Sequence, residues 1–263
     1  SLDCVAPMLP YLHSLIAIPL IYLYTMVMAT ISLTLSLYDP TGIRQHWCAR
    51  TWCKLIAWTV GMKVIIHGRE NLDLSRPAVY MSNHQSYMDI PTLFAFLPFQ
   101  FRIFAKKVLF YIPFMGWHLW RAGNIPVDRG NHSATTKVLN LGVEKLRSGV
   151  PIVVFPEGTR GTELRRVKRF KAGAFKIAQM AKVPVVPITI VGTAHILQKD
   201  SLLFRPGTVH LFIDPPIETA DTDDQRLSDV VAQVQQIMNS NLERVYGQSS
   251  AGTAGSVPVS ILR

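Results

Sequence analysis

A histidine and an aspartate lie five positions apart in the stretch SNHQSYMDIP, which runs from Ser82 to Pro91. On a continuous helix His84 and Asp89 would be about 140° apart around the axis, so their side chains would diverge. If His84 instead lies in a turn before a helix that begins near Tyr87, its imidazole can fold back toward Asp89. An imidazole supported by a carboxylate in this way can serve as a general base.

The same residues also have a purely structural interpretation. Asn83 or Ser86 could cap the helix, and His84 could be an ordinary core or capping histidine. Asp89 could be an acid that the helix dipole favours in the first turn. An isolated H-x4-D pattern therefore does not identify a catalytic dyad, and the rest of the chain must decide.

Charged and small residues follow two further apolar runs. The run IVVF ends at Pro156 and is followed by Glu157, Gly158, Thr159 and Arg160. Glycine lets backbone N–H groups approach an anion, and arginine offers a planar fork for phosphate or carboxylate. The run GNIPVDRG places Asp128 and Arg129 at a similar strand end. Taken singly, each set could also be solvated charge or a surface ion pair.

Alternating strand and helix patterns surround these motifs. Short apolar runs predict strands at residues 63–68, 78–83, 101–106, 124–129, 151–158, 183–192 and 208–214. Helical periodicity predicts helices at residues 44–61, 132–147, 171–181 and 222–246. This alternation predicts an α/β fold, with a mixed or parallel sheet flanked by helices. Two prolines in VPVVPITI predict an edge or wall position for that strand.

The chain begins with a long uncharged segment. No residue between Asp3 and Asp39 carries a formal charge, and the apolar run 14–37 is long enough to cross a hydrocarbon core of about 30 Å. We therefore expect residues 1–42 to form a membrane-associated helical segment. A single span and a re-entrant pair of helices both remain open at this stage.

Basic and aromatic residues follow the uncharged segment. Because Arg44, Arg50 and Lys54 come after it, the positive-inside rule predicts that the rest of the chain lies on the cytoplasmic side. The helix 44–61 also carries three tryptophans, which suit either an amphipathic helix at the membrane surface or a core helix. These tryptophans are Trp47, Trp52 and Trp58.

The charge of the chain is concentrated in one region. The formal net charge is +10, whereas residues 101–182 alone hold 16 Lys and Arg against 4 Asp and Glu, a net +12. Nucleic acid is one candidate partner for such a region, but beside a membrane segment anionic headgroups and phosphorylated small molecules fit better. The three cysteines match no metal-ligand spacing and predict reduced thiols.

Taken together and in this order, NHQSYMD, GNIPVDR, VFPEGTR and VPVVPITI resemble the four successive motifs of the glycerolipid acyltransferase family, whose type member is 1-acylglycerol-3-phosphate acyltransferase. The segments AKKVLFYIPFMGW and RFKAGAFKIA resemble two linking segments of the same family. The resemblance covers about residues 60–215. One departure is Pro126, where the family usually has a bulky apolar residue.

The resemblance implies an acyltransferase α/β domain at residues 43–246, and the small, polar composition of residues 247–263 predicts a flexible tail. It implies acyl transfer from an acyl thioester to the free hydroxyl of 1-acylglycerol-3-phosphate, which gives phosphatidic acid. In this reaction His84 would be the general base and Asp89 would orient it. The donor would be a thioester of CoA or of acyl carrier protein, without a cofactor or a metal.

By the same resemblance, a group of residues would bind the substrates: Lys106, Arg129, Glu157, Gly158, Thr159 and Arg160. The expected partners are lysophosphatidic acid, the thioester donor and the lipid bilayer, with no nucleic acid. Three alternatives stay open. They are acylation of another lysolipid or an aminolipid, a non-catalytic module that binds membranes, and a metal hydrolase in which the histidine and aspartate are ligands.

Overall fold

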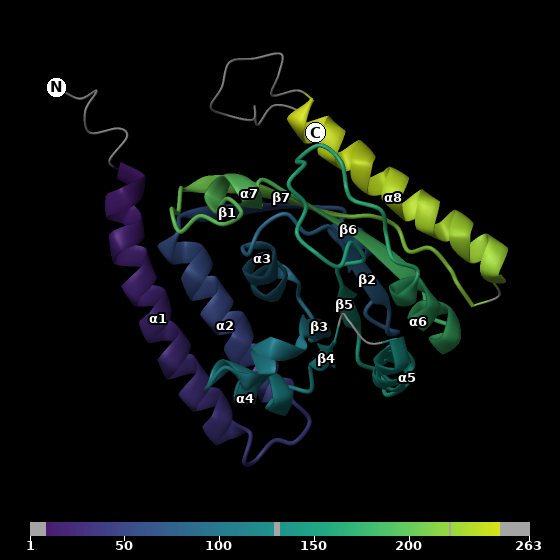
Figure 1. The fold of residues 1–263 in the computed structure, drawn as a ribbon, viewed down its shortest axis with the longest axis horizontal. Coiled ribbons are helices and arrows are strands. Elements are labelled where there is room, and N and C mark those ends of the chain that lie inside the picture. The colour runs from purple at the N-terminus through teal and green to yellow at the C-terminus, as the bar shows by residue number, and fades with distance from the viewer. Residues whose placement is uncertain (1–8, 129–131, 221, 248–263) are drawn as a thin grey trace.

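The fold is described by a computed structural model, which covers residues 9–128, 132–220 and 222–247 (Figure 1). Within these residues one sheet contains β1 (Met62–His67), β2 (Val79–Ser82), β3 (Arg102–Lys106), β4 (Ile125–Val127), β5 (Ile152–Val154), β6 (Val185–Val191) and β7 (Gly207–Ile213). Its longer helices are α1 (Leu9–Leu35), α2 (Ile43–Thr59), α3 (Asp89–Phe96), α5 (His132–Arg147), α6 (Gly173–Ala181) and α8 (Asp224–Tyr246). The predicted mixed sheet flanked by helices is confirmed.

The strand order explains how distant motifs meet. The sheet runs β1-β7-β6-β2-β5-β3-β4, and every neighbouring pair is parallel except β6 and β7. The five strands from β6 to β4 therefore point the same way, and their carboxyl ends form one edge of the sheet. Ligands of open α/β sheets commonly bind at this edge.

The edge position predicted for β6 is wrong. β6 lies between β2 and β7, and all of its residues are buried. Its ladder with β7 stops at the pair Ile188 and Ile213, and the carbonyl of the preceding residue, Pro187, accepts from Asp214 N at 3.0 Å. Pro187 lies just beyond the last residue pair of this ladder, so no ladder hydrogen bond is lost because proline has no N–H. An interior strand therefore tolerates this proline.

Helices cover both faces of the sheet (Figure 1). Alternation along β2 sends Tyr80 into a core shared with α2 and α3. The flanking Val79 and Met81 point into a second core with α6 and α8. The sheet is thus buried from two sides, which accounts for the nearly continuous apolar character of its central strands.

Helix α1 is one continuous helix of 27 residues, which passes through Pro19. Of the helices described, it is the one long and apolar enough to cross a membrane, with a mean hydropathy of 1.9 over its most apolar stretch. It packs along α2 and contacts α4 (Met115–Arg121). A re-entrant hairpin within residues 10–35 is not what the structure contains.

Helix α2 has one buried side, between α1 and α3, so the core-helix interpretation holds for that side. Its tryptophans do not form one stripe. Trp47 and Trp58 are exposed, whereas the indole N–H of Trp52 donates to Thr25 Oγ1 of α1 at 3.0 Å. The five- and six-residue spacings of the three tryptophans rotate them around the helix, which explains the difference.

Several short elements escaped prediction: η2 (Arg69–Asn71), η3 (Lys107–Tyr111), α4 and α7 (Thr193–Ile196). The longest of them has seven residues, which is shorter than the window of about 11 to 18 residues over which helical periodicity can be recognised. The predicted flexible tail at 247–263 lies, apart from Gly247, outside the described residues. The division of the chain between residues 42 and 43 stays a prediction.

Candidate active site

The turn between β2 and α3 brings His84 and Asp89 together. Nδ1 of His84 lies 2.8 Å from Oδ2 of Asp89, so the predicted folding back of the imidazole is confirmed. The chain leaves β2 at Ser82 and enters α3 at Asp89, which leaves six residues for a turn that a continuous helix could not make. The Asp89 side chain is 1% exposed and that of His84 17% exposed, so the carboxylate supports a partly accessible imidazole.

Hydrogen bonds from the same turn hold the carboxylate. Oδ2 of Asp89 accepts from the backbone N–H groups of Gln85 at 2.7 Å and Ser86 at 2.8 Å. Its other oxygen, Oδ1, accepts from the hydroxyl of Thr193 at 2.6 Å. Donors of this kind favour an ionised carboxylate. The ionised form is the one that can stabilise an imidazolium.

The predicted caps make other contacts. The side chain of Asn83 bonds the backbone of Ile190 in β6, accepting from its N–H at 2.7 Å and donating to its carbonyl at 2.9 Å. The hydroxyl of Ser86 donates to Leu197 O at 2.7 Å and accepts from Met88 N at 3.1 Å. Both residues therefore fasten the turn to neighbouring segments, and α3 begins without a side-chain cap.

The imidazole of His84 has one occupied and one available nitrogen. Because Nδ1 faces a carboxylate, the neutral ring places its proton there, which leaves Nε2 as the basic atom. The ring of Phe155 stacks on the imidazole, with centroids 4.3 Å apart. This contact fixes the ring plane, so Nε2 has a defined direction.

Glu157 lies next to the dyad but in a different role from the one expected. Oε1 accepts from the backbone N–H of His84 at 2.8 Å, and Oε2 accepts from the backbone N–H of Lys168 at 3.1 Å. The residue is 5% exposed, and burial raises the pKa of its carboxyl while these two hydrogen bonds oppose the shift. Both oxygens are thus committed to backbone groups, and a carboxylate would repel a phosphate. Glu157 holds the turn in place.

Arg160 follows the same loop after β5. Its guanidinium carbon lies 3.6 Å from the centroid of the Tyr87 ring, and Nη2 is 3.9 Å from the exposed carboxylate of Asp200. Nη1 is buried and has no hydrogen-bond acceptor among the described residues. A buried cationic donor of this kind suits an incoming anion.

The two residues between Glu157 and Arg160 differ in exposure. Gly158 has a φ of 71°, and a Cβ at this position would come within 3.1 Å of the Lys171 side chain, so the tight turn favours glycine. Thr159 is exposed, and its hydroxyl oxygen lies 3.4 Å from Nζ of Lys168. Only Gly158 of this pair lines the cavity described next.

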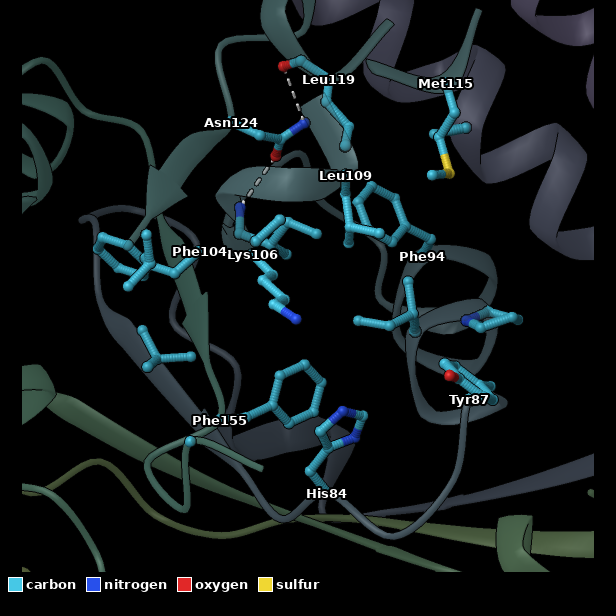
Figure 2. Close-up of a pocket in the computed structure, with 18 of the residues that line it drawn as sticks. His84, Tyr87, Phe94, Phe104, Lys106, Leu109, Met115, Leu119, Asn124 and Phe155 are labelled. Atoms are coloured by element: carbon cyan, nitrogen blue, oxygen red, sulfur yellow. Dashed lines mark hydrogen bonds between the residues drawn. The ribbon is translucent and has the colours of Figure 1, made fainter. Parts of the chain in front are cut away.

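A cavity of about 940 Å³ opens beside His84 (Figure 2). Its lining is mostly apolar and comes from both faces of the sheet, for example Cys53 and Ile56 of α2 and Ile177 of α6. Lys106 at the carboxyl end of β3 is directed into it (Figure 2), and Lys171 also lines it. The arrangement combines a base, two cations and a large apolar volume.

The remaining predicted site residues have mixed outcomes. Asp128 lines the cavity, whereas Arg129 lies outside the described residues. Among the residues that the structure describes, no group of three His, Cys, Asp or Glu could hold a metal ion. Two neighbours of the dyad were missed, Tyr87 and Thr193. Tyr87 lies within the H-x4-D stretch, and Thr193 follows the last of the four motifs, so their positions in the motifs were the available signal.

Comparison with known proteins matches this geometry to one family. A family model described as Acyltransferase matches residues 63–191. A 1-acyl-sn-glycerol-3-phosphate acyltransferase of Chlamydomonas reinhardtii is 37% identical over 79% of this chain and 62% of its own length. The enzyme of that name from Saccharomyces cerevisiae is 30% identical over 86% of this chain and 75% of its own length.

A solved structure agrees with these relatives. The 1-acyl-sn-glycerophosphate (LPA) acyltransferase PlsC of Thermotoga maritima superposes with a TM-score of 0.68 and 28% identity, over 86% of this chain and 95% of that one. The chain spans less than two thirds of the length of some relatives, 62% of the algal protein and 52% of a chloroplastic one from Arabidopsis thaliana. On the yeast match and the fold together, the chain belongs to the glycerolipid acyltransferase family, of the 1-acylglycerol-3-phosphate acyltransferase type.

Proposed function

We propose that this chain transfers an acyl group from an acyl thioester to the free hydroxyl of 1-acylglycerol-3-phosphate, which gives phosphatidic acid. The observation that carries the proposal is the His84–Asp89 pair, whose histidine lines a large apolar cavity. The names of the algal, yeast and bacterial relatives support the choice of acceptor.

In the proposed reaction, Nε2 of His84 takes the proton of the acceptor hydroxyl as its oxygen attacks the thioester carbonyl carbon. The carbon–sulfur bond then breaks, and the departing thiolate takes that proton from the imidazolium. The products are an ester and a free thiol. Asp89 stabilises the imidazolium between the two steps, and no enzyme nucleophile is acylated on this route.

The acceptor phosphate is assigned to cations near the dyad. Arg160 does not itself line the cavity, but it is the main candidate, because its buried Nη1 has no acceptor among the described residues and its guanidinium lies over Tyr87, which does line the cavity. Lys106 and Arg129 would add positive charge, and the backbone at Gly158 and Thr159 would let the anion approach closely. Glu157 would act through the turn that it holds rather than by touching the substrate.

The apolar part of the cavity would hold an acyl chain, and α1 would hold the domain at the bilayer. Nine large apolar side chains of α1 are exposed, from Tyr11 to Ile31. Burying such side chains in lipid is favourable, and the basic residues after α1 support a cytoplasmic position for the catalytic domain. The net charge of +12 in residues 101–182 would attract either a CoA or an acyl carrier protein donor.

Thiol release tests the proposal directly. The full chain, purified in lipid, would be offered acyl-CoA and acyl carrier protein thioesters with a panel of lysolipids, and the products identified by mass spectrometry. The expected result is fastest thiol release with 1-acylglycerol-3-phosphate, with phosphatidic acid as the product. Faster release with another lysolipid or an aminolipid would change the acceptor, and membrane binding without any turnover would favour a binding module.

A further inference from the structure

Both carboxylate oxygens of Asp89 accept hydrogen bonds. The donors to the two oxygens come from different parts of the chain. Oδ2 faces His84 and the backbone of its own turn. Oδ1 receives a hydrogen bond from Thr193, which lies 104 positions later in the chain, at 2.6 Å. Thr193 reaches this place because β6 pairs with β2, so that both strands end at the same edge.

We propose that Thr193 is a positioning residue for the reaction: its hydroxyl sets the orientation and charge of Asp89, and Asp89 in turn sets the basicity and direction of His84. This inference rests on the proposed function, since it describes the same site. It assigns a role in the chemistry to a residue that follows the fourth motif.

Burial makes this hydrogen bond hard to replace. Asp89 and Thr193 are both 0% exposed, so water cannot substitute for the hydroxyl if it is removed. Hydrogen bonds to charged acceptors are about twice as strong as neutral ones. The terminal torsion of an aspartate is broad, so a carboxylate held on one oxygen alone can rotate. Thr193 supplies the second point that fixes its plane.

The position of Thr193 is itself fixed by two neighbouring contacts. Gly192 has a φ of 103°, and a Cβ there would come within 2.4 Å of Thr208 O, so the chain makes a turn that requires glycine. The N–H of Gly192 donates to the hydroxyl oxygen of Tyr246 in α8 at 3.2 Å. At the other end of α7, Leu197 O accepts from Ser86 Oγ at 2.7 Å.

Two other titratable groups face the dyad from packed elements. They are Glu157 from the loop after β5 and Tyr246 from α8. Thr193 is the group that donates to Oδ1 in the contact described above. A change confined to the Thr193 hydroxyl removes this one hydrogen bond, while both neighbouring groups stay in place.

The test compares Thr193→Val, Thr193→Ser and Thr92→Val in the full chain. Valine is close to threonine in shape but lacks the hydroxyl, and serine retains it. Thr92 is the matched control, because it is also 0% exposed and its hydroxyl donates only to neutral partners, with Met88 O at 2.7 Å. Kinetics with thioester and acceptor are combined with an NMR titration of the His84 ring, assigned with His84→Ala.

We expect Thr193→Val to lower kcat by about ten- to a hundredfold while both KM values change by less than about twofold, the range expected for a lost hydrogen bond to a charged group. Without this donor the carboxylate becomes more basic and attracts the imidazolium more strongly. The acid limb of kcat/KM and the midpoint of the His84 titration should therefore both move to higher pH. Thr193→Ser should keep the acid limb of kcat/KM and the midpoint of the His84 titration at their wild-type pH. Thr92→Val should move neither of them.

An unchanged kcat and an unchanged titration midpoint in Thr193→Val would overturn the inference. Equal changes in Thr193→Val and Thr92→Val would also overturn it, because they would show a general loss of packing. If Thr193→Val does not fold, a Thr193→Ser variant that keeps the wild-type midpoint and kcat still supports the role of the hydroxyl, and one that loses both contradicts it. The NMR titration needs no substrate, so failure of the proposed function, seen as an inactive wild-type protein, remains distinguishable.

Discussion

The guanidinium carbon of Arg160 lies 3.6 Å from the ring centroid of Tyr87, a residue located between His84 and Asp89 in the chain. One short turn therefore carries both the proposed base and the platform for the proposed phosphate-binding arginine. A cation over an aromatic ring is stabilised by the electrostatic field of the ring. Tyr87 thus links the turn that carries the proposed base to the proposed phosphate-binding arginine.

Replacing Arg160 with lysine should weaken binding of the acceptor. An ammonium lacks the planar fork and stacks less well on Tyr87, so one charged hydrogen bond is lost, worth about 1.5 to 3 kcal/mol. We expect kcat/KM for 1-acylglycerol-3-phosphate to fall by roughly ten- to a hundredfold, with a smaller change for the thioester donor. Steady-state kinetics with each substrate varied in turn provides the measurement.

Arg69→Lys is a suitable control for this experiment, because Arg69 lies in η2 after the edge strand β1. Arg129→Lys and Lys106→Ala should have smaller effects if these cations set the field around the site. A loss of kcat/KM for the thioester donor rather than for the acceptor would show that Arg160 binds the donor, and the assignment of the acceptor phosphate to Arg160 would then be wrong.

Removing the base should abolish most turnover. His84→Ala is expected to reduce kcat by about 10² to 10⁴-fold, the usual contribution of general-base catalysis. Asp89→Asn should lose a large part of the same factor, because an amide cannot stabilise the imidazolium. Circular dichroism and vesicle binding would check that both variants fold and reach the membrane. Wild-type rates in either variant would contradict the assigned roles.

Filling the cavity should change the choice of acyl chain. Gly173 lines it, and a Cβ at this position would meet Leu139 Cδ2 of α5 at 3.9 Å, an ordinary contact distance, so a larger side chain can enter the space. Gly173→Leu is expected to slow transfer of long acyl chains more than that of short ones. Rates with thioesters of graded length measure this, and the short-chain rate is the internal control. Equal slowing at all lengths would place the acyl chain elsewhere.

Stability should fall in mild acid because of buried histidines. Burial lowers the pKa of His118 from 6.5 to about 4, so the unfolded chain binds a proton in this window while the folded chain does not. Stability is therefore fully present above pH 6.5 and is lost as the pH falls toward 4, by about 3 kcal/mol for this group. Thermal unfolding of His118→Asn should show a smaller loss over the same window.

One further variant and one further histidine define how that experiment is interpreted. Ser32→Ala removes the 2.6 Å contact between Ser32 Oγ and His118 but leaves the histidine, so the acid loss should persist. His46, whose pKa burial lowers to about 3, should supply the remaining loss in His118→Asn. An identical pH dependence in wild type and His118→Asn would show that this histidine does not contribute.

Charges on the exposed face of α1 should release the protein from membranes. Leu15 and Tyr22 are 70% and 69% exposed, so arginine at either place leaves the packing of α1 against α2 intact. Placing arginine within the hydrocarbon core costs about 2.5 to 3.5 kcal/mol. Co-sedimentation with vesicles should drop for Leu15→Arg with Tyr22→Arg. Leu74→Arg, at a 57% exposed position after β1, is the control, and equal losses would contradict insertion of α1.

Much of the secondary structure could be predicted because strand and helix periods are local. The run 183–192 is apolar and β-branched, and it forms β6 at Val185–Val191. Its place in the sheet could not be predicted, since strand order depends on pairings between residues far apart in the chain. Proline was a misleading guide there, because the ladder beside Pro187 had already ended.

The contact between His84 and Asp89 could be expected as one option, because both belong to one turn, but its catalytic interpretation depended on the resemblance of four motifs to a known family. The contact with Thr193 could not be expected, since a threonine has no distinctive chemistry until β6 places it beside a buried carboxylate. Glu157 shows a different limit. The family resemblance implied a substrate contact, whereas burial and two backbone donors give it a structural position. Burial of this kind depends on tertiary packing and leaves no local pattern.

The attachment of α1 to the rest of the protein has a mechanical consequence. Near its start Phe204 N donates to Ser14 Oγ at 2.8 Å, in its middle Trp52 donates to Thr25, and near its end Ser32 contacts His118. A helix bonded to the domain near both ends and in its middle is held rigidly against it and does not act as a flexible tether. Once such a helix lies in a bilayer, the rest of the domain keeps one tilt and one depth relative to the lipid, so a lipid substrate would reach it by lateral diffusion in two dimensions.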